Sequence, residues 1–411
     1  MLPINPKETA VNHPIKSAIA ARPELSLALD AESATVRRER LAGGRIAITS
    51  PKGLHPRNAL LVEAAAAAAG SHALTVMEPD GMAALVLRGL APERRVGLWH
   101  LDLFHLERAV DVARQNQIER LEIHTGSELP VLDESPDLII LHTQIDSEAG
   151  LTLELVRQAH DRLAAGGKLL TCINNPRDQW LRRQLEKAFG NLTLFIKSKG
   201  GLVYSCKRTG KPGTDQDARP ETRFYVKTVQ VKARDTELPF ETCYGVFSSD
   251  GLDGGSHALL DLLKHPEPCR SILDLGCGWG AMGILAAHWF GAERLVLIDA
   301  NARAVEMARR NAQRHGLAER TEIRHEANLE SLAREAETGV YDLVLSNPPY
   351  ATDYRVTELF VQAAARALRA GGEAWMVGKN NPRLEALMTA AFGNAATQRH
   401  WGYDVVRAEK G

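Results

Sequence analysis

Cysteine is scarce in this sequence and shows no pairing pattern. Five cysteines occur in 411 residues, at positions 172, 206, 243, 269 and 277, and none belongs to a CxxC pair. A disulfide framework and a zinc knuckle are therefore not expected, and no other metal site is indicated. A reducing cytoplasm is the predicted compartment.

Long apolar runs are missing as well. The Ala-rich run at residues 64–69 is preceded by Glu63 and closed by Gly70, far short of the roughly 20 residues that cross a bilayer. The first residues lack the basic-then-apolar pattern of a signal peptide. With 44% hydrophobic and 25% charged residues, the composition excludes a collagen-like, coiled-coil or mainly disordered chain.

The formal net charge is only −1, which argues against indiscriminate polyanion binding. The charge is unevenly distributed, however. Residues 101–150 hold 3 basic and 11 acidic side chains, whereas residues 151–235 hold 17 basic and 8 acidic ones. The basic block is either a solvated surface or a site for a polyanionic partner.

The length suggests two domains, and internal repeats define them. Four segments recur in the same order 203 to 206 positions apart: 137–141 and 342–345, 163–167 and 368–372, 174–177 and 380–383, and 188–191 and 391–394. We therefore predict two homologous domains, residues 1–206 and 236–411. Between them, residues 207–235 begin with a stretch rich in Gly, Pro and charge, which indicates a connecting segment.

The second copy alternates short apolar runs with helical periodicity, which predicts a doubly wound α/β sheet. On the predicted helix 302–315, Arg303 is expected on the polar face. Strands are predicted at 271–275, 294–298, 341–346, 373–377 and 400–408, and further helices at 281–290, 357–370 and 384–392.

A glycine-rich turn follows the first of these strands. Gly276, Gly278 and Gly280 allow positive φ and let a ligand approach the backbone, while the next helix presents free N–H groups. Asp299 ends the next strand, 21 residues after Gly278, where a carboxylate can accept both hydroxyls of a ribose. Asp274, inside the first strand, suits an ammonium group.

Two cofactor classes fit such a turn. Gly276, Gly278 and Ala281 satisfy the loose dinucleotide pattern GxGxxG/A. The third glycine, however, lies at 280 and gives GxGxG. Moreover, the ammonium that would suit Asp274 occurs in S-adenosylmethionine and not in NAD. The sequence NPPY at residues 347–350 then ends the strand 341–346, at the sheet edge where ligands bind. Together these features favour S-adenosylmethionine and methyl transfer.

The NPPY segment suits a nitrogen acceptor. An exocyclic amine or amide is a poor nucleophile because its lone pair is delocalised. The side-chain oxygen of Asn347 and the carbonyl of Pro348 can accept its N–H bonds and hold the nitrogen towards a methyl sulfonium. Tyr350 offers a flat face on which a planar substrate can stack.

The tandem layout, the segment GVFSSDGLDGGS at residues 245–256, the glycine turn and NPPY together resemble the bacterial ribosomal RNA guanine-N2 methyltransferases. Within that family the sequence most resembles the small-subunit (16S) enzymes, with the large-subunit enzymes second. The resemblance implies two class I methyltransferase domains: a catalytic second one, and a degenerate first one that aids folding and RNA recognition. It also implies ribosomal RNA as the partner, and we expect a monomer.

The resemblance carries over to individual residues. Phe247 and Ser248 would lie along the cofactor, Asp274 near its methionine amine, Asp299 on its ribose, and Asn328 at the adenine edge.

Several of these positions have structural alternatives. Asn328 could instead be a helix N-cap, and Asp250 and Ser256 could cap a helix that begins near Ser256. Trp279 could contact the cofactor or pack beneath the loop. Cys277 is interpreted as a small loop residue and not a nucleophile.

The chain departs from the family at one point. The family pattern is Asn-Pro-Pro-Phe-His, whereas Tyr350 and Ala351 stand here. Because NPPY also occurs in adenine-N6 and protein-glutamine methyltransferases, these acceptors, or a small molecule, are alternative substrates. A non-catalytic RNA-binding assembly factor is a further alternative.

The first copy lacks the ligand-binding residues. Met77 and Pro79 replace the first two glycines, and His142 replaces Asn347, so cofactor binding is not expected there. His100 and His105 have no third ligand nearby in sequence and are interpreted as structural.

Overall fold

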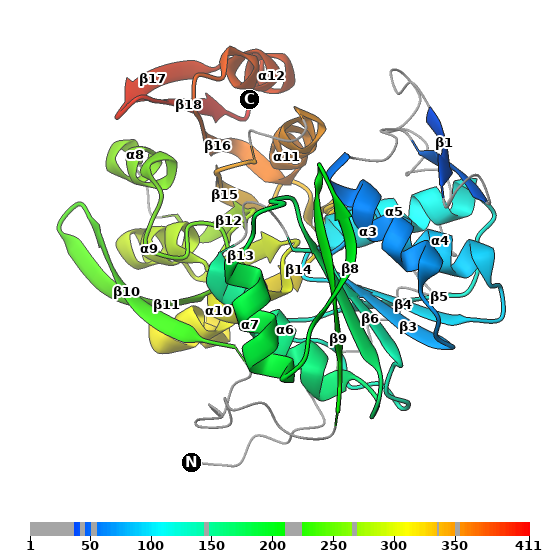
Figure 1. The fold of residues 1–411 in the computed structure, drawn as a ribbon. Helices are drawn as coiled ribbons and strands as arrows, with labels where there is room; N and C mark the ends of the chain where they lie inside the picture. The colour runs from blue at the N-terminus through cyan, green and yellow to red at the C-terminus, as the bar shows by residue number, and fades with distance from the viewer. Residues whose placement is uncertain are drawn as a thin grey trace. The chain divides into compact units, whose positions relative to one another are not determined.

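The computed structural model describes residues 37–41, 46–50, 56–143, 148–209, 224–264, 269–334, 337–349 and 354–411. The chain forms two compact units, one up to Phe224 and the other from Tyr225 onward (Figure 1). The division falls inside the segment 207–235. No helix in the described ranges has the length and apolar character needed to cross a membrane.

Unit 1 is a seven-stranded sheet with helices on its faces, preceded by a two-stranded hairpin. Its elements are β1 (Arg37–Leu41), β2 (Ile46–Ser50), α3 (Pro56–Ala67), β3 (His72–Val76), α4 (Met82–Leu90), β4 (Arg95–His100), α5 (Leu103–Gln115), β5 (Leu121–Thr125), β6 (Leu138–Leu141), α6 (Ala149–Arg162), β7 (Lys168–Ile173), α7 (Trp180–Phe189), β8 (Thr193–Ser198) and β9 (Gly201–Lys207).

Unit 2 repeats this arrangement. Its elements are β10 (Val226–Ala233), β11 (Thr236–Cys243), α8 (Gly254–Leu262), β12 (Ser271–Leu275), α9 (Ala281–Phe290), β13 (Arg294–Asp299), α10 (Ala302–Arg314), η1 (Ala318–Arg320), β14 (Thr321–His325), η2 (Glu330–Ala333), β15 (Tyr341–Ser346), α11 (Tyr354–Ala367), β16 (Leu368–Gly378), α12 (Pro382–Phe392), β17 (Ala396–His400) and β18 (Tyr403–Glu409).

Both sheets have the same strand order. In unit 2 it is β14-β13-β12-β15-β16-β18-β17, and in unit 1 it is β5-β4-β3-β6-β7-β9-β8. The first five strands of each order are parallel, and the last two join antiparallel. The predicted duplication of a doubly wound α/β fold is confirmed. In such a sheet ligands bind at the carboxyl ends of the strands, beside the point where the order reverses.

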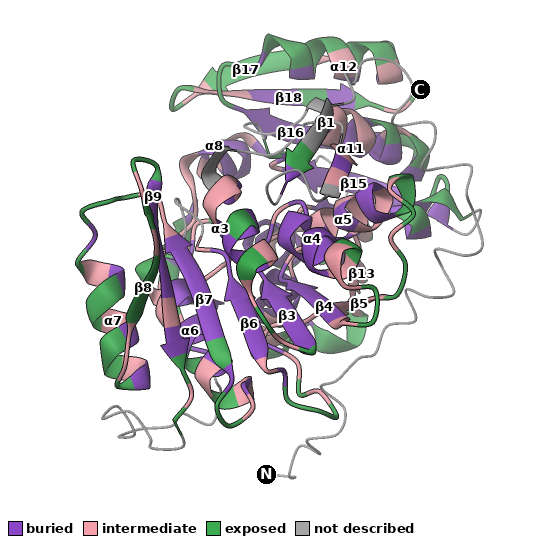
Figure 2. Cartoon of the chain, turned by 45° about the vertical axis from the view of Figure 1, so that its right-hand side comes forward, coloured by how far each residue is buried: buried purple, intermediate pink, exposed green. Residues whose placement is uncertain are grey.

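The central strands are buried on both faces, as Figure 2 shows for β3, β6 and β7. In unit 2, α11 and α12 pack on one face of the sheet, against alternate residues such as Leu273 and Leu275. Asp274, between these two, faces α9 on the other side. The apolar runs that predicted these strands therefore reflect burial on both faces.

The repeated sequence AFGN has a structural cause. Gly190 and Gly393 end α7 and α12 in the left-handed conformation, with φ of 69° and 77°, which glycine adopts most easily. The next residues, Asn191 and Asn394, bind both backbone groups of one residue in the neighbouring strand, Lys207 and Glu409 respectively. The repeat thus preserves a helix end and its attachment to the sheet.

The N-terminal hairpins were not predicted from the sequence, although they too are duplicated. In unit 2 the Asn311 side chain accepts from the backbone N–H of Glu241 at 2.7 Å and donates to its carbonyl at 2.8 Å. In unit 1, Asn116 makes the same pair of bonds to Thr49 at 2.7 and 2.8 Å. Each hairpin is therefore fixed to a helix by one asparagine amide.

The structure corrects three local predictions. The helix expected at 357–370 is α11, but it ends at Ala367 because β16 begins at the next residue, Leu368. The strand expected at 400–408 begins only at Tyr403, because His400 ends β17. Arg303 is fully buried instead of lying on the polar face, since its guanidinium donates to the carbonyl of Tyr244 at 2.6 Å.

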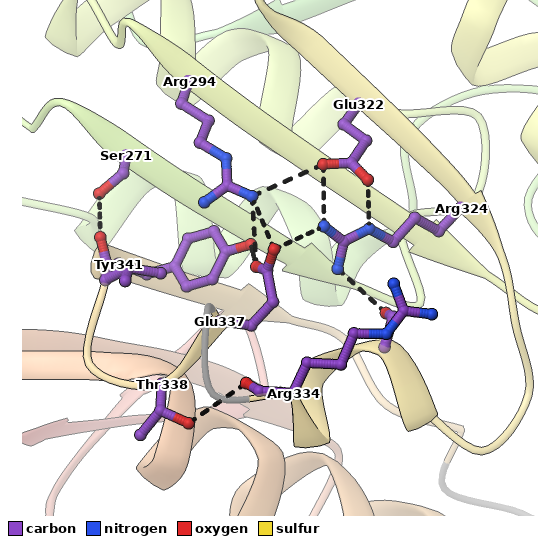
Figure 3. Close-up of polar contacts among 10 residues, drawn as sticks. Ser271, Arg294, Glu322, Arg324, Arg334, Glu337, Thr338 and Tyr341 are labelled. Atoms are coloured by element: carbon purple, nitrogen blue, oxygen red, sulfur yellow. Dashed lines mark hydrogen bonds and ion pairs between the residues drawn. The ribbon is translucent and has the colours of Figure 1, made fainter.

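Charged side chains form a network at the amino end of the unit 2 sheet (Figure 3). Glu337 accepts from Arg294 at 2.9 Å, from Arg324 at 3.0 Å and from the hydroxyl of Tyr341. Burial favours the neutral acid, but these three donors outweigh it and hold the pKa of Glu337 below its usual value. The network therefore stabilises the fold with Glu337 ionised.

Glu337→Ala should lower the free energy of unfolding by about 2 kcal/mol, because the largely buried Arg324 and the hydroxyl of Tyr341 each lose an acceptor. Among the described residues, only Glu322 then remains to pair with the two arginines. Since the folded-state pKa of Glu337 is lowered, the difference from wild type should be present at neutral pH and shrink as the pH falls below about 4. Urea unfolding at several pH values measures it.

Glu293→Ala is the matched control for this prediction. The Glu293 side chain lies 3.9 Å from Arg270, and both are more than 70% exposed, so its loss should change stability by less than about 1 kcal/mol. Equal effects of the two substitutions would contradict a special role for the network.

Candidate active site

The glycine loop of unit 2 joins β12 to α9 at the carboxyl edge of the sheet. Gly276, Gly278 and Gly280 all have positive φ, of 68°, 55° and 86°. A side chain at Gly280 would meet Ala308 of α10 at 3.3 Å, whereas the space beside Gly278 is open to at least 4 Å. Gly280 thus permits close helix packing, and Gly278 leaves the backbone accessible to a ligand.

Asp274 is fully buried below this loop. One carboxylate oxygen, Oδ2, accepts from the N–H of Gly283 at 2.8 Å, while the other, Oδ1, has no hydrogen-bond partner. Burial, together with the charge of Asp299, raises the pKa of Asp274 to about 7. A buried acceptor without a partner fits a donor from outside the chain, such as an ammonium group.

Asp299 ends β13 next to the loop and holds it in place. Its two oxygens accept from the N–H of Gly278 and the N–H of Asn301, each at 2.8 Å. A carboxylate oxygen has a second acceptor site, so these bonds leave capacity for ribose hydroxyls. Asn301 in turn caps α10.

Asn347 follows β15, the strand beside β12. Its amide nitrogen donates to Asp253 Oδ1 at 3.0 Å and to Ser256 Oγ at 3.1 Å. These two acceptors fix which way the amide is turned, so its oxygen lies on the opposite side of the group. Pro348 is buried and Pro349 exposed, whereas Tyr350 and Ala351 lie outside the described residues.

Asp253 is the partner of Asn347 that sequence reasoning missed. The residue that caps α8 is Asp253, which accepts from Gly255 N at 2.8 Å and from Ser256 N at 3.3 Å. Asp250, considered as a cap, is instead exposed and pairs with Lys227. The signal was present in the sequence as Asp followed three residues later by Ser256.

The segment before α8 lies beside the glycine loop. Phe247 is 69% exposed, and its carbonyl accepts from the indole N–H of Trp279 at 3.3 Å. Ser248 has a φ of 54° and donates through its hydroxyl to the carbonyl of Gly251 at 2.8 Å. The ring of Trp279 packs edge-on against Phe240, so this residue lies beneath the loop.

Asn328 lies in the turn after β14. Its side-chain oxygen accepts from the N–H of Glu330 at 3.2 Å, and its amide donates to the carboxylate of Glu330 at 2.9 Å. Asn328 therefore stabilises the start of η2 and remains half-buried, but it is not the helix N-cap that its structural alternative predicted, because Leu329 holds that position. Cys277 is buried, and burial raises the pKa of its thiol well above the usual value.

The equivalent loop of unit 1 has a similar backbone conformation, but it lacks the open space that lies beside Gly278 in unit 2. Met77 has the positive φ of Gly276, at 59°, and its N–H donates to Trp99 O at 3.0 Å. The carboxylate of Glu78 turns inward and accepts from the N–H groups of Ala83 and Ala84. The first N–H groups of α4, which is the counterpart of α9, are thus bound by the side chain of Glu78 and are not open to a ligand.

Two histidines replace the other polar positions in unit 1. His100 stands where Asp299 stands in unit 2, and burial lowers its pKa well below the usual value, with His105 and His142 contributing. His142 stands where Asn347 does and contacts Asn58 Oδ1 at 2.8 Å. The cavity at this point is about 10 Å³, room for one water molecule.

Comparison with known proteins identifies the family. A family model, the methyltransferase small domain, matches residues 48–205 and again residues 237–407. The chain belongs to the methyltransferase small domain family. The predicted methyltransferase class and its tandem doubly wound domains are confirmed.

Individual relatives cover parts of the chain. The Bacillus subtilis protein YbxB is 30% identical over 197 residues, which is 47% of this chain and 96% of that protein. Ribosomal RNA small subunit methyltransferase C of Pseudomonas entomophila is 29% identical over 243 residues, covering 54% of this chain and 71% of that one.

A solved structure matches nearly the whole chain. It is the T. thermophilus 16S rRNA N2 methyltransferase in complex with AdoMet and guanosine, which has a TM-score of 0.70 and 20% identity. The match covers 92% of this chain and 98% of that one. It shows that the two-unit fold is shared.

Asp274→Asn should change how stability depends on pH. Because the folded-state pKa of Asp274 is raised to about 7, its contribution is fully present below pH 4 and declines as the pH rises towards 7. Between pH 5 and 8, wild type should therefore lose more unfolding free energy than the variant, by at least about 1 kcal/mol. Urea denaturation across this range measures the difference.

Asp235→Asn serves as the control, since Asp235 is exposed in the turn between β10 and β11. It should keep the wild-type pH dependence. Parallel curves for wild type and Asp274→Asn would show that Asp274 does not titrate in this range.

Proposed function

We propose that this chain transfers a methyl group from S-adenosylmethionine to the exocyclic N2 amine of a guanine in 16S ribosomal RNA. The observation that carries the proposal is the fixed amide of Asn347, on the strand beside the glycine loop. Relatives named ribosomal RNA small subunit methyltransferase C support the substrate class. The target base must be unpaired or flipped out to reach this edge.

The residues of unit 2 fit the cofactor. The partnerless Oδ1 of Asp274 suits the methionine ammonium, and the open space beside Gly278 admits the ligand to the backbone. Asp299 would bind the ribose and Asn328 the adenine edge. Phe247 and Ser248 would cover the cofactor from the segment before α8, with Gly276 and Gly280 shaping the turn.

The proposed chemistry rests on positioning. The cofactor supplies an electrophilic methyl group on a sulfonium. Asn347 Oδ1 and the carbonyl of Pro348 accept the N–H bonds of the target amine and hold its nitrogen in line for attack. Tyr350 stacks on the base, and the amine proton leaves to solvent after transfer.

The sequence NPPY itself favours a second candidate, methylation of adenine N6 or of a protein glutamine amide. The same two acceptors would hold either nitrogen. Product analysis separates the candidates: purified protein is incubated with labelled S-adenosylmethionine and undermethylated ribosomal subunits, free RNA or protein extract, and the digested product is identified. We expect N2-methylguanosine; label only in N6-methyladenosine or in protein would overturn the assignment.

We infer that unit 1 serves folding and RNA recognition, and that the protein acts as a monomer in the cytoplasm, where ribosomal subunits are its substrate. The five cysteines are buried and none is joined in a disulfide, which fits a reducing compartment. The basic segment that includes Lys197, Lys199 and Lys207 is the candidate surface for RNA phosphates.

The chain should bind one S-adenosylmethionine, because unit 1 fills its own loop with Glu78 and Met77. Isothermal titration calorimetry is expected to give a stoichiometry of one. Asp299→Ala should weaken binding at least about tenfold through loss of charge-assisted hydrogen bonds. The matched substitution His100→Ala in unit 1 should leave the affinity unchanged, and a stoichiometry of two would contradict the assignment.

Asn347→Ala should abolish methyl transfer, with kcat reduced about 100-fold or more, while cofactor affinity stays the same. Asp253→Asn keeps a good N-cap but loses the carboxylate that orients the Asn347 amide. We expect its kcat to fall about tenfold without a change in cofactor affinity.

The equivalent substitution in unit 1, His142→Ala, is the control and should retain turnover, with folding checked by circular dichroism. Undiminished turnover in Asn347→Ala would refute the proposed hold on the target nitrogen.

A further inference from the structure

A tryptophan occupies the tip of the β17–β18 hairpin in an unfavourable backbone conformation. His400 pairs with Tyr403, so the loop has two residues, Trp401 and Gly402. Both have positive φ, 49° and 79°, as in a type I′ turn, where asparagine and glycine are preferred. A bulky residue in this region is an outlier, and such strain often marks a functional site.

The side chain of Trp401 is also exposed, although tryptophan side chains are usually largely buried. It is 61% exposed and lies against two imidazole rings. The ring of His400 stacks on it at a centroid distance of 5.3 Å and an angle of 21°, and the ring of His257 lies 5.7 Å away. These contacts hold the indole while its side chain stays largely open to solvent.

The hairpin tip lies at the same edge of the sheet as the active site. Asp404 pairs with Gly378 at the end of β16, and Met376 of that strand pairs with Ser346 at the end of β15. The tip therefore extends past the carboxyl ends of the parallel strands. Asn347, the residue after β15, lies at that same edge.

One turn of α8 connects the tip to Asn347. Asp253, which binds the Asn347 amide, accepts on its backbone carbonyl from the N–H of His257 at 3.0 Å. A side chain at Gly254 would meet the ring of Tyr403 at 2.9 Å, so this glycine lets the hairpin approach the helix closely. Figure 1 shows α8 near the β17–β18 hairpin.

Two exposed cations, Lys379 and Arg399, lie near the tip, together with two carboxylates: Asp404, 4.0 Å from Arg399, and Asp261, 3.1 Å from His400. Lys379 is exposed and its Nζ lies 5.8 Å from the centroid of the Tyr403 ring. Arg399, also exposed, donates to Asn380 Oδ1 at 2.6 Å. In unit 1 the equivalent tip is Lys199 and Gly200, so the aromatic tip residue occurs only in the copy that has the glycine-rich loop.

We propose that Trp401 stacks on an unpaired RNA base next to the target nucleotide, with Lys379 and Arg399 facing its phosphates. The inference rests on the proposed function. An aromatic ring beside cations suits a single-stranded polynucleotide, since every base has a face that can stack and every linkage carries negative charge. The contact adds binding to the substrate without touching the reacting atoms.

Trp401→Asn tests the proposal without endangering the fold, because asparagine tolerates the backbone of this turn. The variant should keep its melting temperature within about 3 °C. KM for 16S RNA should rise about 5- to 100-fold, while kcat at saturating RNA and the affinity for S-adenosylmethionine change less than about twofold. Trp401→Phe should restore most of the affinity.

Direct binding separates stacking from charge. A fluorescent 12-nucleotide oligouridylate and an abasic strand of the same length and charge are titrated against each protein. Wild type should prefer the strand with bases, and Trp401→Asn should lose most of this preference. Val340→Asn, which removes an exposed apolar side chain just before β15, at the other end of the sheet, should behave as wild type.

The outcomes are distinct. If wild type methylates RNA but Trp401→Asn binds and methylates it equally well, this inference fails and the proposed function stands. If the variant loses activity only on ribosomal subunits while oligonucleotide binding is unchanged, the surface takes a protein and the inference is overturned. If wild type binds no RNA, both proposals fail together.

Discussion

The carboxyl edge of unit 2 depends on one carboxylate, Asp253. The first N–H groups of a helix need acceptors, and Asp253 supplies them for α8 while also accepting from the Asn347 amide. Helix start and candidate catalytic amide are therefore held by the same group. Since His257, one turn further, supports Trp401, the reacting nitrogen and its RNA neighbour would be positioned from a single turn of helix.

The two copies of the fold share the residues that build it and differ in those that would bind ligands. Asn191 and Asn394 make equivalent backbone bonds, as do Asn116 and Asn311, because both sheets need the same attachments. The glycine-rich loop is different: in unit 1, Glu78 satisfies the helix start itself. A copy relieved of ligand binding can close its own pocket and still fold.

The sequence predicted what depends on local pattern. β12, α9 and β15 match their expected bounds, because strands buried on both faces are continuous apolar runs and glycine ends the helix. The β10–β11 hairpin and the edge strand β17 alternate or are polar, so they carry a weaker signal. The capping role of Asp253 follows a local pattern, but its contact with Asn347 joins residues 94 positions apart, which no local pattern reports.

The carboxyl end of the unit 2 sheet holds both an unsatisfied buried group and a strained residue. At the carboxyl edge, Asp274 buries an oxygen without a partner and Trp401 adopts a positive φ; each destabilises the protein. At the amino edge, Glu337 satisfies Arg294, Arg324 and Tyr341 together. Because stability is shared across a cooperative domain, the satisfied edge can offset the strained one, and the site can remain preorganised for its ligands.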